Sequence, residues 1–258
     1  MDPQVDAILN LIFRWLHVVA GVMWIGHLWF FNFVNAQVAK TYDADSKKKV
    51  IPELMPRALY WFRWGAAYTF ITGFFLLGLV IYMGGAAFDP ETQTKGLAIG
   101  VGLASLPVGF LIYDVLWKQF AKNEMVGAIV SFVLIVAYSF GANMVMSGRS
   151  LFIHVGAVFG TIMAANVWMR IWPNQRKIIA AAKEGKPPPD GVAPLAALRS
   201  KHNTYMSVPL ILFMVSNHYP TIYGMDMRWI IPPVIVAIGW GMTKLMYNKS
   251  GTPAPAQF

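Results

Sequence analysis

Seven long apolar runs, separated by polar connections, dominate this 258-residue sequence. They lie near residues 7–35, 57–83, 97–117, 125–146, 151–172, 204–219 and 227–247. About 20 mainly apolar residues are the length that an α-helix needs to cross a bilayer. We therefore predict an all-α integral membrane protein, a bundle of about seven transmembrane helices embedded in the lipid bilayer.

The composition supports this fold class. Apolar residues make up 57% of the chain and charged residues only 13%, whereas a soluble domain usually carries about a quarter charged residues. Seven spans use nearly the whole length, so we predict one transmembrane helical domain over residues 1–250 and a short flexible tail over residues 251–258.

The Lys and Arg residues predict the orientation. Sixteen lie in the odd-numbered connections and the tail, and only Lys95, Arg149 and Arg228 lie in the even-numbered ones. Since cytoplasmic connections carry the excess of Lys and Arg, we place the N-terminus outside and the C-terminus in the cytoplasm of a bacterial inner membrane. Anionic lipid headgroups account for the basic excess, and we expect no nucleic-acid partner.

The chain has no cysteine. This excludes disulfides, thiolate metal sites and the Cys-x-x-Cys-His attachment of a c-type haem. No phosphate-binding loop, His-Glu-x-x-His motif or Gly-x-Ser-x-Gly elbow is present either. Any haem must therefore be held without a covalent bond.

Three histidines are the most informative polar residues of the apolar runs. In the predicted topology His17, His154 and His218 all lie in the outer half of the bilayer. Ionisable residues at such depths usually mark a functional path or a cofactor, and a neutral imidazole can ligate haem iron. We predict that His17, with His218 or His154, ligates one haem b, with a second haem as an alternative. The competing interpretation of each histidine is a hydrogen bond to a neighbouring helix.

Residues near His17 favour a flat macrocycle over a bare metal ion. Gly21, one turn along the same face, would let a porphyrin lie against the backbone. Arg14, three residues earlier, is suitably placed to pair with a haem propionate. Arg14 could instead extend to the outer headgroups.

Four other polar residues of the chain receive structural interpretations. His27 lies about 15 Å below His17; it could ligate a second haem or serve a proton path, but we favour a structural role. We expect His202 at the cytoplasmic surface, where it would cap or anchor the sixth helix. We expect Arg63 and Asp114 to be interfacial anchors.

Four stretches carry a family resemblance. They are RWLHVVAGVMWIG at residues 14–26, LFIHVGA at 151–157, HNTYMSVP at 202–209 and SNHYP at 216–220. Together they resemble the membrane domain of the urate hydroxylase PuuD family, also called the urate oxidase N-terminal domain. The opening helix is also similar, more weakly, to other small haem-binding membrane families with a histidine there.

This resemblance implies a membrane oxidoreductase that oxidises urate. Long members of the family continue into a c-type cytochrome domain. These 258 residues contain no cysteine to attach its haem, so we expect electron transfer to a separate cytochrome c or respiratory complex. Two alternatives are a non-catalytic subunit of a respiratory membrane complex and a small-solute or proton transporter whose histidines titrate during transport.

Overall fold

The computed structural model describes residues 2–91 and 93–252, and over these ranges it contains helices and no strand. The longer helices are α1 (Pro3–Trp29), α3 (Ala44–Leu76), α4 (Lys95–Gln119), α5 (Glu124–Val145), α6 (Gly148–Asn166), α7 (Trp172–Glu184), α8 (Val192–Val215) and α10 (Ile231–Ser250). Short pieces, α2 (Ala36–Val38) and α9 (Pro220–Tyr223), complete the set together with two 3₁₀ turns, η4 (Ser216–His218) and η5 (Arg228–Ile230). The predicted all-α class is confirmed.

Three π-helical segments continue α-helices without a break and so form longer helical rods. They are η1 (Phe30–Asn35) after α1, η2 (Leu77–Met83) after α3 and η3 (Val167–Ile171) between α6 and α7. Because helical backbone continues through each segment, the chain forms the rods Pro3–Val38, Ala44–Met83 and Gly148–Glu184. Isolated π-turns inside α-helices often occur at functional sites.

Six helical segments are long and apolar enough to cross a membrane. They are the three rods and the segments Lys95–Gln119, Glu124–Val145 and Arg228–Ser250. The sixth predicted run, residues 204–219, lies mostly in α8, which is not among these six. Polar residues such as Arg199, Asn203 and Ser207 lower the hydropathy of α8, but they are buried against protein. The apolar run at residues 204–219 therefore correctly predicted a helix, and the polar side chains of that helix are buried against neighbouring helices.

Helix α3 begins well before the predicted run at residue 57. The Asp43 side chain accepts a hydrogen bond from the Ser46 N–H at 2.7 Å and caps the helix. Ile51, Met55 and Leu59 then follow at helical spacing and are buried or half-buried. The polar connection between the first two predicted runs is therefore mostly helix, and its apolar stripe accounts for the difference.

The connection between the fifth and sixth predicted runs, 151–172 and 204–219, is also mostly helical. Helix α7 runs to Glu184 and ends at Gly185, whose φ of 70° is a left-handed conformation that favours glycine. After the Pro187–Pro189 break, α8 begins at Val192. Only the short segment between the two helices is extended or turn-like.

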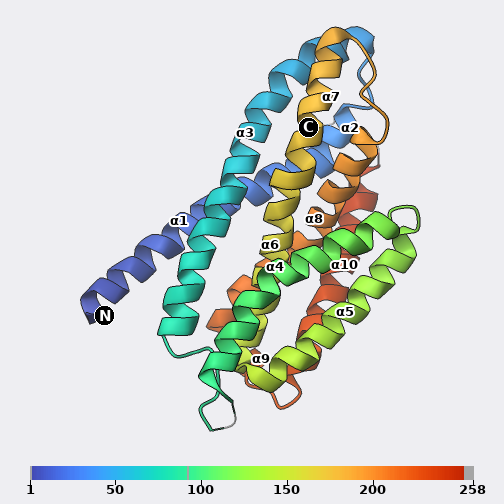
Figure 1. The fold of residues 1–258 in the computed structure, drawn as a ribbon. Helices are drawn as coiled ribbons and strands as arrows, with labels where there is room; N and C mark the ends of the chain where they lie inside the picture. The colour runs from blue at the N-terminus through green and yellow to red at the C-terminus, as the bar shows by residue number, and fades with distance from the viewer. Residues whose placement is uncertain (1, 92, 253–258) are drawn as a thin grey trace.

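Helix α6 forms the centre of the bundle (Figure 1). In its rod 72% of the most apolar stretch is buried inside the protein, against at most 33% in the other five candidate spans. It packs against α3, α4, α5 and α8. Helix α1 instead packs mainly against α3 and leaves a stripe exposed along its other face, formed by Leu11, Trp15, Val18 and Val22. The bundle thus has a dense centre and a thinly packed α1 side.

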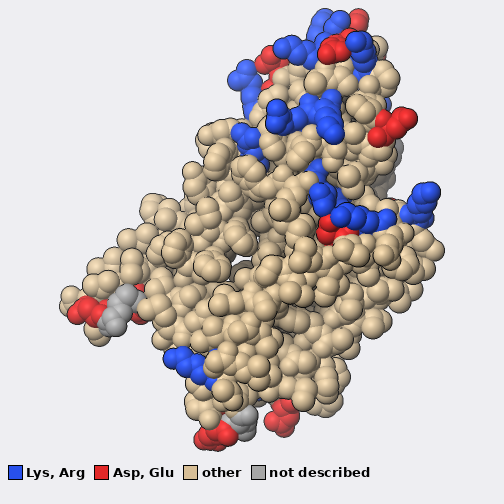
Figure 2. Space-filling view, viewed as in Figure 1, with Lys and Arg blue, Asp and Glu red and all other residues tan. Residues whose placement is uncertain are grey.

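Charged residues gather at one end of the molecule. Figure 2 shows Lys and Arg clustered around the end where α3 begins and α7 ends, whereas the opposite end carries few of them. The Lys and Arg residues counted in the odd-numbered connections thus gather at one end of the bundle. The orientation of the two ends across a membrane stays a prediction. Most of the predicted tail, residues 253–258, lies outside the described residues.

Candidate functional site

His17 reaches from α1 to α3. Its Nδ1 lies 3.1 Å from the Thr72 hydroxyl oxygen, and that hydroxyl donates its own proton to the Tyr68 carbonyl at 2.6 Å. The Thr72 oxygen must therefore accept from His17 Nδ1–H, which leaves Nε2 with its lone pair in the neutral ring. Among the described residues no hydrogen bond occupies that Nε2.

Glycines let α1 and α3 approach closely around His17. A Cβ atom at Gly73 would lie 2.9 Å from His17 Cε1, so the imidazole lies against the α3 backbone. A Cβ atom at Gly21 would lie 3.9 Å from the Thr69 methyl. Gly21 therefore faces α3. Arg14, the residue predicted to pair with a haem propionate, is half-buried on α1.

His154 is fully enclosed at the centre of the bundle. Its Nδ1–H donates to the Ser150 carbonyl at 2.7 Å, and its Nε2 lies 2.8 Å from the Tyr82 hydroxyl. Since Nδ1 carries the proton, Nε2 accepts from Tyr82. Both ring nitrogens are thus used within the protein, and a Cβ atom at Gly102 would lie 2.4 Å from Nε2.

The structure does not bring the three predicted ligands to one point. His17 contacts α3 at Thr72 and His154 contacts its extension at Tyr82, ten residues further on, or roughly 15 Å along the axis. His218 lies exposed in η4. Over residues 2–91 and 93–252, no three His, Cys, Asp or Glu side chains form a group able to hold a metal ion.

His27 is half-buried on α1 and donates from Nδ1 to its own helix, to the Met23 carbonyl at 2.7 Å. It borders a small cavity of about 410 Å³ that Gly26, Phe30 and Ala58 also line. This bond to its own helix agrees with a structural role.

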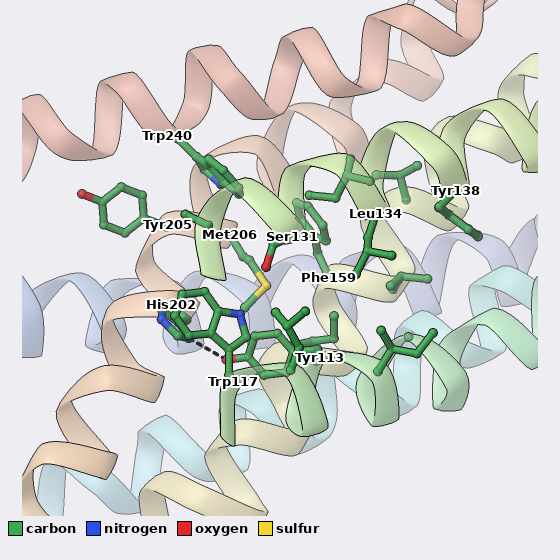
Figure 3. A pocket seen from close by; sticks show the side chains of 18 of the residues that line it. Tyr113, Trp117, Ser131, Leu134, Tyr138, Phe159, His202, Tyr205, Met206 and Trp240 are labelled. Carbon is green, nitrogen blue, oxygen red and sulfur yellow. Dashed lines mark hydrogen bonds between the residues drawn. The ribbon is translucent and has the colours of Figure 1, made fainter. Parts of the chain in front are cut away.

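A larger cavity of about 970 Å³ lies between α4, α5, α6, α8 and α10. Its lining is mainly apolar, with polar groups at one end near the C-terminus of α4 and the N-terminus of α5. Figure 3 shows Trp117, His202 and Tyr113 together at one side, with Leu134 and Tyr138 further along.

His202 lies in this cavity wall, so its predicted place as a surface cap is wrong. Because α8 starts at Val192, His202 is in the middle of the helix and half-buried. Its ring centroid lies 3.9 Å from that of Trp117, and its Nδ1 lies 2.9 Å from the Tyr113 hydroxyl. The apolar pattern had placed the start of this helix about twelve residues too late.

A chain of hydrogen bonds fixes the proton on His202. The Met163 carbonyl can only accept, so Asn203 donates its amide N–H to it at 2.9 Å and turns its oxygen towards Asn166. Asn166 in turn donates both to Asn203 and to the Tyr113 oxygen, each at 2.9 Å. The Tyr113 proton is then directed to His202 Nδ1, which leaves His202 Nε2–H as a donor.

Asp114 lies next to Tyr113 and is buried, so its predicted role as an interfacial anchor is corrected. Its carboxylate accepts from Arg170 at 3.0 and 2.6 Å, from Arg199 at 3.0 Å and from Lys118 at 2.9 Å. Arg199 is 1% exposed, and its guanidinium lies 4.8 Å from the Tyr113 ring centroid. One carboxylate thus joins α4, α8 and the segment η3.

Sequence reasoning found the histidines but missed Tyr82, Tyr113 and Trp117, which bind or pack against them. A Tyr-Asp pair at residues 113–114 inside an apolar run was the available signal for the second cluster. No comparable signal pointed to Tyr82, because its partner comes from another helix.

A family model described as urate oxidase N-terminal matches residues 41–254. The chain belongs to the urate oxidase N-terminal family. The match includes His154, His202 and His218 but begins after His17, so the resemblance of the opening helix lies outside it. The comparisons with curated proteins and with solved structures returned no match.

Proposed function

We propose that this urate oxidase N-terminal family member is a membrane oxidoreductase that holds haem b at His17 and oxidises urate. The observation that carries the haem proposal is the free Nε2 of His17, in a ring whose Nδ1–H is held by Thr72. The family match supports the choice of urate as the electron donor. A separate cytochrome c or another respiratory carrier would accept the electrons.

The residues around His17 suit a histidine that ligates haem iron. A ligating histidine usually donates its other ring N–H to an oxygen, which fixes the tautomer and the ring orientation. Thr72 is that oxygen here, and Gly73 leaves room for the imidazole against α3. Arg14, one turn away on α1, supplies a cation for a propionate. When bound, haem supplies one-electron redox chemistry at its iron.

The remaining histidines differ in their suitability as a second ligand. His154 would have to lose the Tyr82 hydrogen bond before its Nε2 became free. His218 is exposed and is therefore the more accessible of the two. Since the structure brings neither of them to His17, we place the iron at His17 and assign no second ligand.

An absorption spectrum of the purified protein, expressed with ample haem, tests the cofactor. We expect a Soret band and a pyridine-haemochrome signal in the wild type, loss of both in His17→Ala and their retention in His27→Ala. His27 is the matched control because it is on the same helix and bonds only its own backbone. Wild-type protein without either signal would contradict the proposal.

The substrate requires a separate measurement. We expect membranes containing the wild type to consume urate, and membranes with equal amounts of His17→Ala to lose this activity. If neither consumes urate while the wild type still shows the Soret band, the urate proposal fails and the haem proposal stands.

A further inference from the structure

The 970 Å³ cavity between α4, α5, α6, α8 and α10 has the size of a ligand site. Sites for small molecules usually measure about 300–1,000 Å³, with apolar walls and a few placed polar groups. Several lining residues of α4 and α5 have exposed side chains, among them Val108, Ile112 and Leu134. The cavity therefore lies along two candidate membrane spans, a position that suits a lipid-soluble ligand.

The cavity is long and narrow in proportion to its volume. Its lining on α4 extends from Val101 to Trp117, which is roughly 24 Å at the helical rise. On α5 it extends from Glu124 to Tyr138, roughly 21 Å. A compact solute would leave most of this length empty, whereas a molecule with a small head and an extended apolar tail would fill it.

The hydroxyls inside the long part of the cavity are already used by the protein. Ser105 donates to the Gly102 carbonyl and Ser131 to the Gly127 carbonyl, both at 2.7 Å. Tyr138 donates to the Ser105 hydroxyl at 3.1 Å. These protons are unavailable to a ligand, so this part suits a hydrocarbon tail.

The polar end offers a neutral donor between aromatic rings. The hydrogen-bond chain from Met163 leaves His202 Nε2–H without a partner among the described residues, while Trp117 packs against the same ring. A carbonyl oxygen on a flat ring can accept from this donor and stack on these aromatic side chains. Lys201 forms an ion pair with Glu124, so a lipid phosphate would meet a carboxylate beside one of the two lysines of the lining.

We propose that this cavity binds an isoprenoid quinone, with its ring at His202 and Trp117 and its tail between α4 and α5. The proposal rests on the cavity and the His202 tautomer and does not depend on the haem at His17. A phospholipid is the main competing occupant, because Lys244 also lines the polar end beside the Lys201–Glu124 pair.

Equilibrium binding of a tritium-labelled ubiquinone with two isoprenoid units, to wild-type protein in detergent, tests the proposal. We expect saturable binding that neither farnesol nor phosphatidylglycerol displaces at equal concentration. Farnesol has an isoprenoid chain one unit longer than that of the probe and no quinone ring, and phosphatidylglycerol carries the competing headgroup. No saturable binding, or equal displacement by either competitor, would overturn the proposal.

Three variants locate the site. We expect His202→Leu to weaken quinone binding about tenfold, because one hydrogen bond to the ring is lost. His202→Gln keeps an N–H donor and should recover most of the affinity. Ala128→Trp fills the cavity without removing a polar group, and should abolish binding. Wild-type affinity in folded Ala128→Trp would overturn the proposal even where His202→Leu fails to fold.

The outcome is separable from that of the haem proposal. His17→Ala removes the proposed haem ligand from the α1–α3 pair and should leave the quinone affinity of the α4–α5 cavity unchanged. Loss of quinone binding in folded His17→Ala would contradict two independent sites.

Discussion

The α1–α3 side and the α6 centre of the bundle each hold a histidine that donates from Nδ1 to an oxygen. At His17 the acceptor is Thr72 on a neighbouring helix, and Nε2 is left with its lone pair. At His154 the acceptor is the carbonyl of Ser150 one turn back, and Tyr82 occupies Nε2. One ring nitrogen is thus without a protein partner among the described residues at His17, whereas both are hydrogen-bonded within the protein at His154.

Packing separates the two regions further. Helix α1 contacts mainly α3 and exposes its other face, whereas α6 is enclosed by four helices. His17 therefore lies between two helices at the edge of the bundle, whereas His154 lies in its core. Burial of a histidine is therefore weaker evidence for ligation than the state of its second nitrogen.

The largest expected effect concerns the buried ion cluster on the enclosed side. Asp114→Ala leaves Arg199 buried without its anion, and we expect it to lower the free energy of unfolding by about 3–5 kcal/mol. Thermal unfolding in detergent measures this. Glu53→Ala, which breaks an exposed pair with Arg57, should cost no more than about 1 kcal/mol. Equal shifts in the two variants would contradict a structural role for the cluster.

Matched glycine substitutions test the packing difference. Gly102→Ala would place Cβ 2.4 Å from His154 Nε2, and we expect it to cost about 1–3 kcal/mol of stability. Gly100→Ala on the same helix meets no atom within 4 Å and serves as the control.

On the α1 side we expect a different response to the same change. Gly73→Ala should displace the His17 ring, lower the haem content and leave stability nearly unchanged, because α1 can shift. Gly78→Ala meets no neighbour within 4 Å and should keep its haem. A stability loss in Gly73→Ala as large as that in Gly102→Ala would contradict the proposed difference in packing between the α1 side and the α6 centre.

Removing the Thr72 hydroxyl tests whether its hydrogen bond to Nδ1 holds the His17 imidazole in the tautomer that frees Nε2. Thr72→Val should weaken haem binding by about 10–100-fold, since outer partners of a ligating histidine typically contribute that much to affinity. Haem release to apomyoglobin measures the change. Thr69→Val is the control, because the Thr69 hydroxyl bonds only the Gly65 carbonyl of its own helix. An equal loss of haem affinity in both variants would show that the Thr72 hydrogen bond has no particular role in haem binding.

The smallest expected effect is on the enclosed histidine. Tyr82→Phe removes one buried hydrogen bond and should cost about 0.5–1.5 kcal/mol while leaving the haem content unchanged. Tyr68→Phe, at an exposed tyrosine of the same rod, should have no effect on either quantity. A rise in haem content in Tyr82→Phe would identify His154 as a latent ligand and break the comparison.

The helices could be predicted from the sequence because each apolar run carries its own signal. Their ends were less certain: α3 begins at Ala44, where the Asp43 cap and the stripe through Met55 outweigh two prolines. Helix α8 begins at Val192 because its polar residues are buried against protein and not exposed to solvent. Hydropathy alone cannot distinguish a polar residue in a loop from one that a neighbouring helix encloses.

The histidines could be found in the sequence, but their chemistry could not. Whether Nε2 is free depends on Thr72 for His17 and on Tyr82 for His154, and both partners come from a helix distant in the chain. The register between helices decides which partner meets which ring, and no sequence pattern in a single chain records that register. The cavity beside His202 was missed for the same reason.

The rod Ala44–Met83 joins two distant parts of the molecule with a single helical backbone. Its far end carries the basic surface shown in Figure 2, and its middle carries Thr72, the partner of His17. The residue that accepts the His17 proton is therefore fixed in the same unbroken helix as the basic surface, and its position follows from the placement of that helix as a whole.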